Sequence, residues 1–264
     1  MNKIHLLDNG LINKIAAGEV VERPASVVKE LMENSIDAGA TSITVEIAEG
    51  GTSVIKITDN GKGIPKDEIR TAFMRHATSK IDSFEDLENV LTLGFRGEAL
   101  SSIASVAQVE MLTRTENDSM GTRIVINGGV VDREEECAAN VGTVFYVKNI
   151  FFNTPARRKF LKKPATEGSY ISEIVNRIAL GHPNIAIKYV NNGNIVLQTN
   201  GDGNVKNSLF YIYGKDIASK MLSLESEKEG YILKGLVGKP ELSRGNRNYE
   251  NFFINGRFIK STLV

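Results

Sequence analysis

Hydrophobic and polar positions follow two different periods along the chain, one typical of α-helices and one typical of β-strands. From residue 27 to 38, apolar positions recur at about 100° per residue, which predicts an amphipathic helix. Its apolar face consists of Val27, Val28, Leu31, Met32, Ser35 and Ala38. Strict alternation of Ile, Val and Thr over 42–50 and 53–61 then predicts two strands. A second helix is expected over 65–80, because Pro65 suits a first helical turn.

The same patterns continue and divide the chain into two parts. Helices are expected over 93–109 and 170–183, and strands over 108–115, 121–128 and 142–150. A hairpin around Asn-Gly is expected over 185–199, and further strands over 231–239 and 251–259. The polar run 200–207 is the best boundary, giving units 1–203 and 204–264. The order predicts an α+β fold with a mixed sheet, followed by a unit too small to be a complete domain.

Composition narrows the class of protein. The 264 residues are 41% hydrophobic, enough for a sizeable core, and 32 basic residues balance 32 acidic ones. No overall basic field therefore attracts nucleic acid. The single cysteine, Cys137, excludes a disulfide framework and a cysteine-based zinc site. Without an apolar leader or a run of about 18 apolar residues, a cytoplasmic protein with no membrane partner is expected.

Polar residues of the first helix raise the question of a ligand. Glu30 and Asn34 lie one turn apart at the border of the apolar face, where their side chains project together. Lys29 and Glu33 are expected on the far side of the helix. Taken alone, the helix edge is better explained as a solvated flank.

The segment 59–64, Asp-Asn-Gly-Lys-Gly-Ile, adds a carboxylate at the end of a strand. Asn-Gly is a strong hairpin signal, but Pro65 then favours a helix instead of a returning strand. Gly61 and Gly63 permit close backbone approach, and Asp59 can accept a hydrogen bond from the amino group of adenine. Guanine presents a carbonyl at that position, which would leave two acceptors facing each other. The segment therefore favours an adenine site over a plain turn.

A third segment is suited to phosphate. In 94–102, Gly94 and Gly97 flank two residues just before a helix, whose free N–H groups attract anions. A glycine-rich turn without a ligand is the plainer explanation. No G-x-x-x-x-G-K-[ST] motif occurs, so a P-loop is excluded. Asn34 offers an oxygen of the kind that Mg²⁺ accepts.

Taken in order, "ELMENSIDAGA" (30–40), "DNGKGI" (59–64) and "GFRGEAL" (94–100) resemble the ATP-binding motifs of gyrase, the histidine kinases and the MutL mismatch-repair proteins. Longer runs over 15–31, 75–81, 93–103 and 151–161 resemble the MutL family in particular, and the likeness covers nearly the whole chain. It implies a Bergerat-type two-layer α/β sandwich over 1–203. It also implies part of a ribosomal protein S5 domain 2-like unit over 204–264.

The resemblance implies a role for each motif residue. Glu30 would be the general base that activates water, Asn34 the Mg²⁺ ligand, and Asp59 the adenine-reading group, helped by Thr143. Gly61 and Gly63 would line the nucleotide, and Glu33 would take no part. A lid over the phosphates of ATP would consist of Thr78, Ser79, Lys80, Gly94, Phe95, Arg96, Gly97, Glu98, Ala99 and Leu100.

Partners also follow from the resemblance. It implies a homodimer that closes on ATP, non-specific DNA binding, and coupling of MutS to a downstream endonuclease or helicase. The basic cluster over 157–163 is a candidate DNA contact, although such clusters are usually just solvated. Family members carry a later lysine motif that this sequence lacks, so weak or absent hydrolysis is expected. A gyrase-type ATPase domain and a non-hydrolysing scaffold are the alternatives.

Overall fold

The first part of the chain forms one mixed sheet. The computed structural model describes residues 17–18, 20–79, 93, 97–247 and 249–260. The strands of the sheet are β1 (Ser42–Ala48), β2 (Val54–Asp59), β3 (Gln108–Arg114), β4 (Gly121–Asn127), β5 (Val130–Cys137), β6 (Gly142–Lys148), β7 (Ala186–Asn191) and β8 (Asn194–Gln198). Their order is β5-β4-β3-β6-β2-β1-β7-β8. Only β1 and β7 pair in parallel, and the other neighbours are antiparallel.

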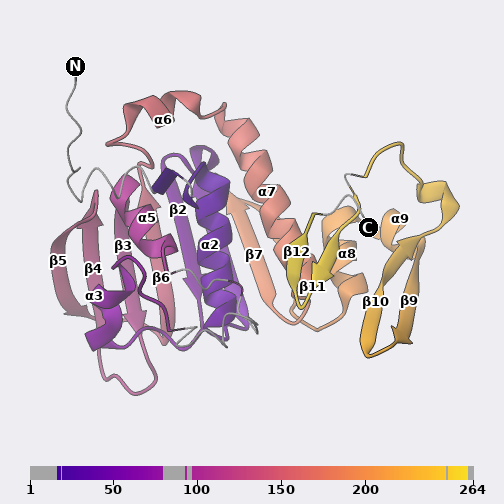
Figure 1. Ribbon diagram of the computed structural model, residues 1–264, viewed down its shortest axis with the longest axis horizontal. Helices are drawn as coiled ribbons and strands as arrows, with labels where there is room; N and C mark the ends of the chain where they lie inside the picture. Colours follow the sequence, from indigo (N-terminus) through magenta and orange to yellow (C-terminus); the bar gives the residue numbers. More distant parts are fainter. Residues whose placement is uncertain (1–16, 19, 80–92, 94–96, 248, 261–264) are drawn as a thin grey trace.

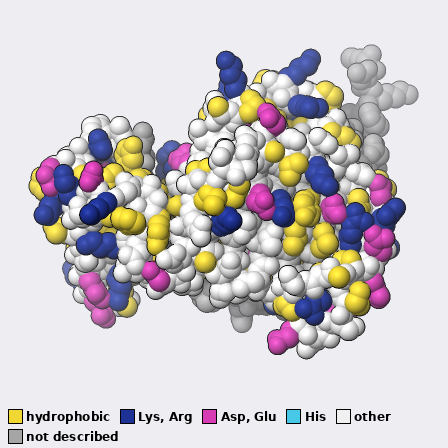
Figure 2. All heavy atoms as spheres, turned by 180° about the vertical axis from the view of Figure 1, so that it is seen from behind, with side chains coloured by type: hydrophobic (Ala, Val, Ile, Leu, Met, Phe, Trp, Pro, Cys, Tyr) yellow, Lys and Arg dark blue, Asp and Glu magenta, His cyan; other side chains and the backbone are white. Residues whose placement is uncertain are grey.

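Helices cover one face of this sheet, as Figure 1 shows. They are α2 (Pro24–Asp37), α5 (Ala99–Val106) and α7 (Pro164–Gly181). The opposite face carries cross-strand ion pairs such as Lys56–Glu46 at 2.7 Å and Lys148–Glu110 at 2.9 Å. Figure 2, seen from behind, shows basic and acidic side chains interspersed there. The predicted two-layer α/β sandwich with a mixed sheet is therefore confirmed.

The core lies between the helices and the sheet, where the expected periods place it. Alternate residues of β1 and β2 are buried, and α2 buries Val27, Val28, Leu31 and Met32 against them. Pro24 opens α2, and Gly39 ends it at φ 75°, a left-handed conformation that glycine adopts without strain. The N–H groups of Gly39 and Ala40 bond back to Ile36 and Ser35. This termination directs the chain into β1.

The helix expected over 65–80 is confirmed only over 66–72, and the described residues after it are not helical. The structure has a 3₁₀ turn, η2 (Lys66–Glu68), and one α-helical turn, α3 (Ile69–Ala72). The N–H groups of Phe73 and Met74 then bond to carbonyls three residues back, and His76 has φ 61°. Ile69 is the only fully buried residue of these two elements, so no apolar face anchors a longer helix there.

Three further elements were not expected from the sequence. They are the edge strand β5, the helix α6 (Pro155–Phe160), and β9 (Met221–Lys228). β5 has the mostly polar sequence VVDREEEC, and it is supported by ion pairs such as Arg70–Glu134 at 2.6 Å and Lys66–Glu136 at 2.8 Å. Its side chains are largely exposed, so hydrophobic alternation could not reveal it.

The last part of the chain lies beside the C-terminal end of α7, at the right of Figure 1. It contains α8 (Val205–Tyr213), α9 (Lys215–Ser219), β9, β10 (Tyr231–Gly238), η3 (Pro240–Leu242), and the hairpin β11 (Phe252–Ile254) with β12 (Arg257–Ile259). A small cluster joins Leu180 of α7 to Leu209 and Ala218. Arg177 of α7 also lies over the ring of Phe258, 4.2 Å from its centroid. The division at 203/204 stays a prediction.

Across the described residues, no helix combines the length and the apolar character that crossing a bilayer requires.

Candidate functional site

A row of buried polar side chains crosses four adjacent strands on the helix-facing side of the sheet. Thr113 of β3 is paired with Thr122 of β4 and with Thr143 of β6, and Thr143 is paired with Asp59 of β2. Directly opposed residues project to the same side of a sheet, so the row is continuous. All four are buried. The register therefore brings the predicted pair Asp59 and Thr143 together at one end of the sheet.

Asp59 is held by three donors. Its Oδ2 accepts from the Ser35 hydroxyl at 2.8 Å, its Oδ1 accepts from the Gly61 N–H at 2.9 Å, and the Thr143 N–H donates a third bond. Burial raises the pKa of Asp59, and these three bonds partly oppose the rise. A carboxylate offers about four acceptor positions, so roughly one remains for a ligand N–H.

The Ser35–Asp59 bond also joins α2 to the end of β2. The predicted general base and metal ligand, Glu30 and Asn34, lie on α2 within five residues of this contact. Neither is fully buried, and the Glu30 side chain keeps 25% of its surface exposed. Asp59 is thus joined to the helix that carries Glu30 and Asn34, while the chemical roles of all three residues stay predictions.

Glu33 was expected on the far side of the helix, away from the apolar face, but its side chain is not solvated there. Only 12% of its side chain is exposed, and its Oε2 lies 2.9 Å from Lys29 Nζ. Burial raises the pKa of Glu33, while Lys29 and, more weakly, Arg257 lower it. Lys29 Nζ also lies 3.0 Å from Glu30 Oε1, so one ammonium group serves both glutamates.

Gly61 and Gly63 pack closely against their own chain. A Cβ at Gly63 would lie 2.2 Å from the carbonyl oxygen of Arg114, and Gly63 has φ 72°. A Cβ at Gly61 would lie 2.9 Å from Cβ of Ala38, at the end of α2. Both glycines are therefore required by packing beside Asp59, and their contact with a nucleotide stays a prediction.

The two ends of the predicted lid lie against each other. A Cβ at Gly97 would lie 2.6 Å from the carbonyl oxygen of Ala77, next to Thr78 and Ser79. Glu98 Oε1 lies 3.5 Å from Arg75 and 3.4 Å from His76 Nδ1. Ala99 and Leu100 begin α5 directly afterwards. The remaining predicted lid residues, Lys80, Gly94, Phe95 and Arg96, lie outside the described residues.

Ser35 and Thr113 were missed as site residues. Both are buried polar side chains on faces that are otherwise apolar. Thr113 Oγ1 accepts from the Ile64 N–H at 2.9 Å and lies 3.1 Å from Thr143 Oγ1, so it fixes the glycine turn to the sheet. A serine inside an apolar stripe was the available signal, because buried hydroxyls need partners.

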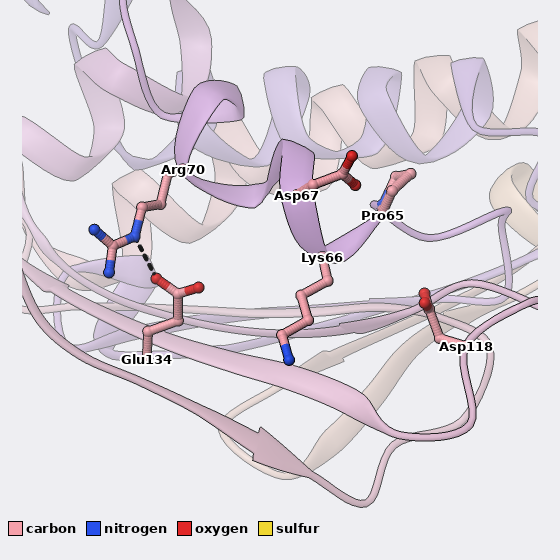
Figure 3. Close-up of a pocket in the computed structure, with 6 residues that line it drawn as sticks. All are labelled: Pro65, Lys66, Asp67, Arg70, Asp118 and Glu134. Carbon is pink, nitrogen blue, oxygen red and sulfur yellow. Dashed lines mark hydrogen bonds and ion pairs between the residues drawn. The ribbon is translucent and has the colours of Figure 1, made fainter.

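A surface hollow elsewhere on the fold is separate from this junction. It lies between η2–α3 and β5, as Figure 3 shows, and it is lined by Pro65, Lys66, Asp67, Arg70, Asp118 and Glu134. Arg70 pairs with Glu134 across it. None of the predicted site residues lines this hollow. Among the described residues, no group of three or more His, Cys, Asp or Glu side chains is arranged to hold a metal ion.

Comparison with known proteins identifies the class of this fold and site. The profile of the family described as "Histidine kinase-, DNA gyrase B-, and HSP90-like ATPase" matches residues 22–141, which contain α2, β2 and the glycine turn. The sandwich is therefore an ATPase domain of this class. The profile "DNA mismatch repair protein, C-terminal domain" matches residues 209–264.

Individual relatives define the family more narrowly. The solved Aquifex aeolicus MutL ATPase domain complexed with ADP is 30% identical with a TM-score of 0.73, covering 92% of this chain and 85% of that one. The DNA mismatch repair protein MutL of Agathobacter rectalis is 56% identical over 264 residues, 100% of this chain and 41% of the relative. For MutL of Caldanaerobacter subterraneus the identity is 51%, over 100% of this chain and 45% of the relative. The chain belongs to the MutL family. It spans less than half the length of these two curated relatives.

Proposed function

We propose that this chain is the ATP-binding and ATP-hydrolysing region of a DNA mismatch-repair protein. The observation that carries the proposal is the junction of α2 with β2, where Ser35 bonds to Asp59 beside the helix edge of Glu30 and Asn34. A buried carboxylate with about one acceptor position to spare suits the amino group of adenine. Membership of the MutL family supports ATP as the nucleotide.

Asn34 is the proposed magnesium ligand. Magnesium at nucleotide sites takes one or two oxygen ligands from the protein and completes its shell with phosphate oxygens and water. One carboxamide oxygen, one turn from a carboxylate on the same helix edge, fits that pattern. Held there by Asn34, the ion would offset charge on the phosphate oxygens.

Glu30 is the proposed general base. It takes a proton from the attacking water as the water oxygen bonds to the terminal phosphorus, and the bond from that phosphorus to the ADP oxygen breaks. A positioned base of this kind contributes about 10²- to 10⁴-fold to the rate. The start of α5 at Ala99 supplies backbone N–H groups suited to phosphate.

In the whole protein, ATP binding acts as a switch. Two protomers close on ATP, hold DNA non-specifically, and couple MutS to a downstream endonuclease or helicase in the cytoplasm. Hydrolysis of the terminal phosphate reverses the closure, because the contacts to that phosphate hold the closed state. The family of the chain supports this role.

Nucleotide binding and turnover in the full-length protein test the proposal. Glu30→Ala is expected to retain ATP binding and to lose turnover by about 10²-fold or more. Asp59→Ala is expected to lose binding. The control is Glu46→Ala, which removes a lysine-paired glutamate from the open face of the sheet and leaves both properties unchanged. Wild-type turnover in Glu30→Ala removes the base assignment, and a wild-type protein that binds ATP without turnover is a scaffold.

A further inference from the structure

Lys29 occupies an unusual position between two acidic side chains of its own helix. Its Nζ lies 3.0 Å from Glu30 Oε1 and 2.9 Å from Glu33 Oε2. The pair with Glu33 follows helical spacing, since residues four apart are neighbours on a helix surface. The pair with Glu30 does not, because consecutive residues point about 100° apart. Lys29 therefore reaches around the helix to Glu30 while Glu33 holds its ammonium group.

Glu33 is a firm anchor for this arrangement. Its side chain is 12% exposed, against 43% for Lys29 and 25% for Glu30. A partly desolvated ion pair is screened less by water and salt than a surface pair, so its geometry is better fixed. The bond to Lys29 uses only Oε1 of Glu30, which leaves Oε2 able to accept a proton.

A second cation supports Glu33 from the C-terminal part of the chain. Arg257 of β12 interacts electrostatically with Glu33, and its Nη2 donates to the carbonyl oxygen of Leu93 at 2.6 Å. The N–H of Leu93 donates to Asp37 Oδ1, at the end of α2, at 3.0 Å. The hairpin β11–β12 is thus connected to the helix that carries Glu30.

We infer that Lys29 is a positioning residue for Glu30: anchored by Glu33, it fixes the rotamer of the Glu30 carboxylate so that Oε2 faces the attacking water. The inference rests on the proposed function, in which Glu30 is the general base. A carboxylate that rotates freely loses the alignment needed for proton transfer, and misplacement by about 1 Å can cost 10²-fold in rate. Binding of ATP does not depend on this alignment.

Steady-state turnover of the full-length protein separates positioning from a structural role. Lys29→Met is expected to lower kcat roughly 10- to 100-fold while the KM for ATP stays within about twofold. Lys29→Arg keeps a cation with several N–H donors and is expected to recover most of kcat. Glu33→Gln, which keeps the size of the side chain, is expected to lower kcat in the same direction by a smaller factor.

The control is Lys56→Met, which removes a lysine from a 2.7 Å ion pair on the open face of the sheet. It is expected to leave both kinetic parameters unchanged. Unchanged kcat in Lys29→Met, or a loss confined to KM, overturns the inference. The inference is also overturned if Lys29→Arg does not recover kcat although its circular dichroism spectrum shows that the variant is folded.

The variant Glu30→Ala distinguishes failure of the positioning role of Lys29 from failure of the proposed function. If Glu30→Ala abolishes turnover and Lys29→Met does not reduce it, only the positioning role is wrong. If Glu30→Ala turns over ATP at the wild-type rate, the proposed base is wrong and the positioning role falls with it.

Discussion

The Ser35 hydroxyl is the side-chain donor that the structure gives to the buried carboxylate of Asp59, so Ser35→Ala tests how that carboxylate is held. The two groups are 2.8 Å apart, and the residues are 4% and 9% exposed. A hydrogen bond to a charged group contributes about 1.5–3 kcal/mol, and burial leaves little solvent to replace it. Ser35→Ala is therefore expected to lower the free energy of unfolding by about that amount. At about 2–4 °C per kcal/mol, Tm falls by roughly 3–12 °C.

The stability lost in Ser35→Ala should depend on pH, and the titration of Asp59 sets the direction of that dependence. Burial raises the pKa of Asp59 in the folded protein above its unfolded value of about 3.9. Stability from such a group is fully present below the unfolded pKa and is lost as pH rises through the folded pKa. Removing the Ser35 donor raises the folded pKa further, so more stability is lost above it. The cost of Ser35→Ala is then small near pH 4 and reaches its full size only above the folded pKa.

Urea and thermal denaturation of the chain at about pH 4, close to the unfolded pKa of Asp59, and at about pH 8 measure the difference. The matched control is Ser172→Ala, because the Ser172 hydroxyl lies 2.9 Å from the carbonyl oxygen four residues back in its helix, much as the Ser35 hydroxyl lies 3.1 Å from the corresponding carbonyl oxygen. Within the described residues, the Ser172 hydroxyl bonds to the Gly168 carbonyl and to Tyr189 and to no carboxylate, so the cost of Ser172→Ala should not change with pH. An equal cost for Ser35→Ala at both pH values refutes the reasoning.

Three further outcomes are expected. Gly63→Ala should destabilise the fold by about 2–5 kcal/mol in thermal denaturation, since it adds a clash with the Arg114 carbonyl to the backbone strain. Its control is Gly193→Ala, which should cost only about 1–2 kcal/mol, because Gly193 has φ 80° but open space around it. Asp59→Asn should weaken ATP binding by roughly 10- to 150-fold in calorimetry and lower the ratio of ATP to GTP affinity, because an amide can donate to the guanine carbonyl. Asn34→Ala should abolish the magnesium dependence of ATP affinity, and an unchanged dependence removes its metal role.

Much of the sandwich was predictable because its elements are strongly periodic. The apolar stripe of α2 and the alternation in β1 and β2 each follow from burial on one face. The candidate residues Glu30, Asn34 and Asp59 could be selected because acidic or amide groups occur at the edge of a helix and at the tip of a strand. What the periods could not give is the register, since the pairing of Asp59 with Thr143 joins residues far apart in the sequence.

The errors have a common physical cause. The helix expected over 65–80 ends early because it lacks a buried face beyond Ile69, and β5 is an exposed edge strand that pairs with β4 and has little apolar packing. Glu33 was placed on the solvated side from helix geometry alone. Its side chain is only 12% exposed, and Arg257 of β12 lies close enough to act on it electrostatically. Each feature depends on tertiary contacts that a local pattern does not contain.

The same dependence explains why the site motifs are long. A desolvated carboxylate is costly unless donors compensate it, and the three donors to Asp59 come from α2, from β6 and from the glycine turn. Each donor needs its own support: Ser35 needs the helix packed on the sheet, and the turn needs Gly63 against Arg114 and Thr113 against Ile64. A single acceptor position for the proposed adenine contact therefore constrains residues in at least four elements. This accounts for a proposed nucleotide site that is specified by several separate runs of sequence instead of one compact loop.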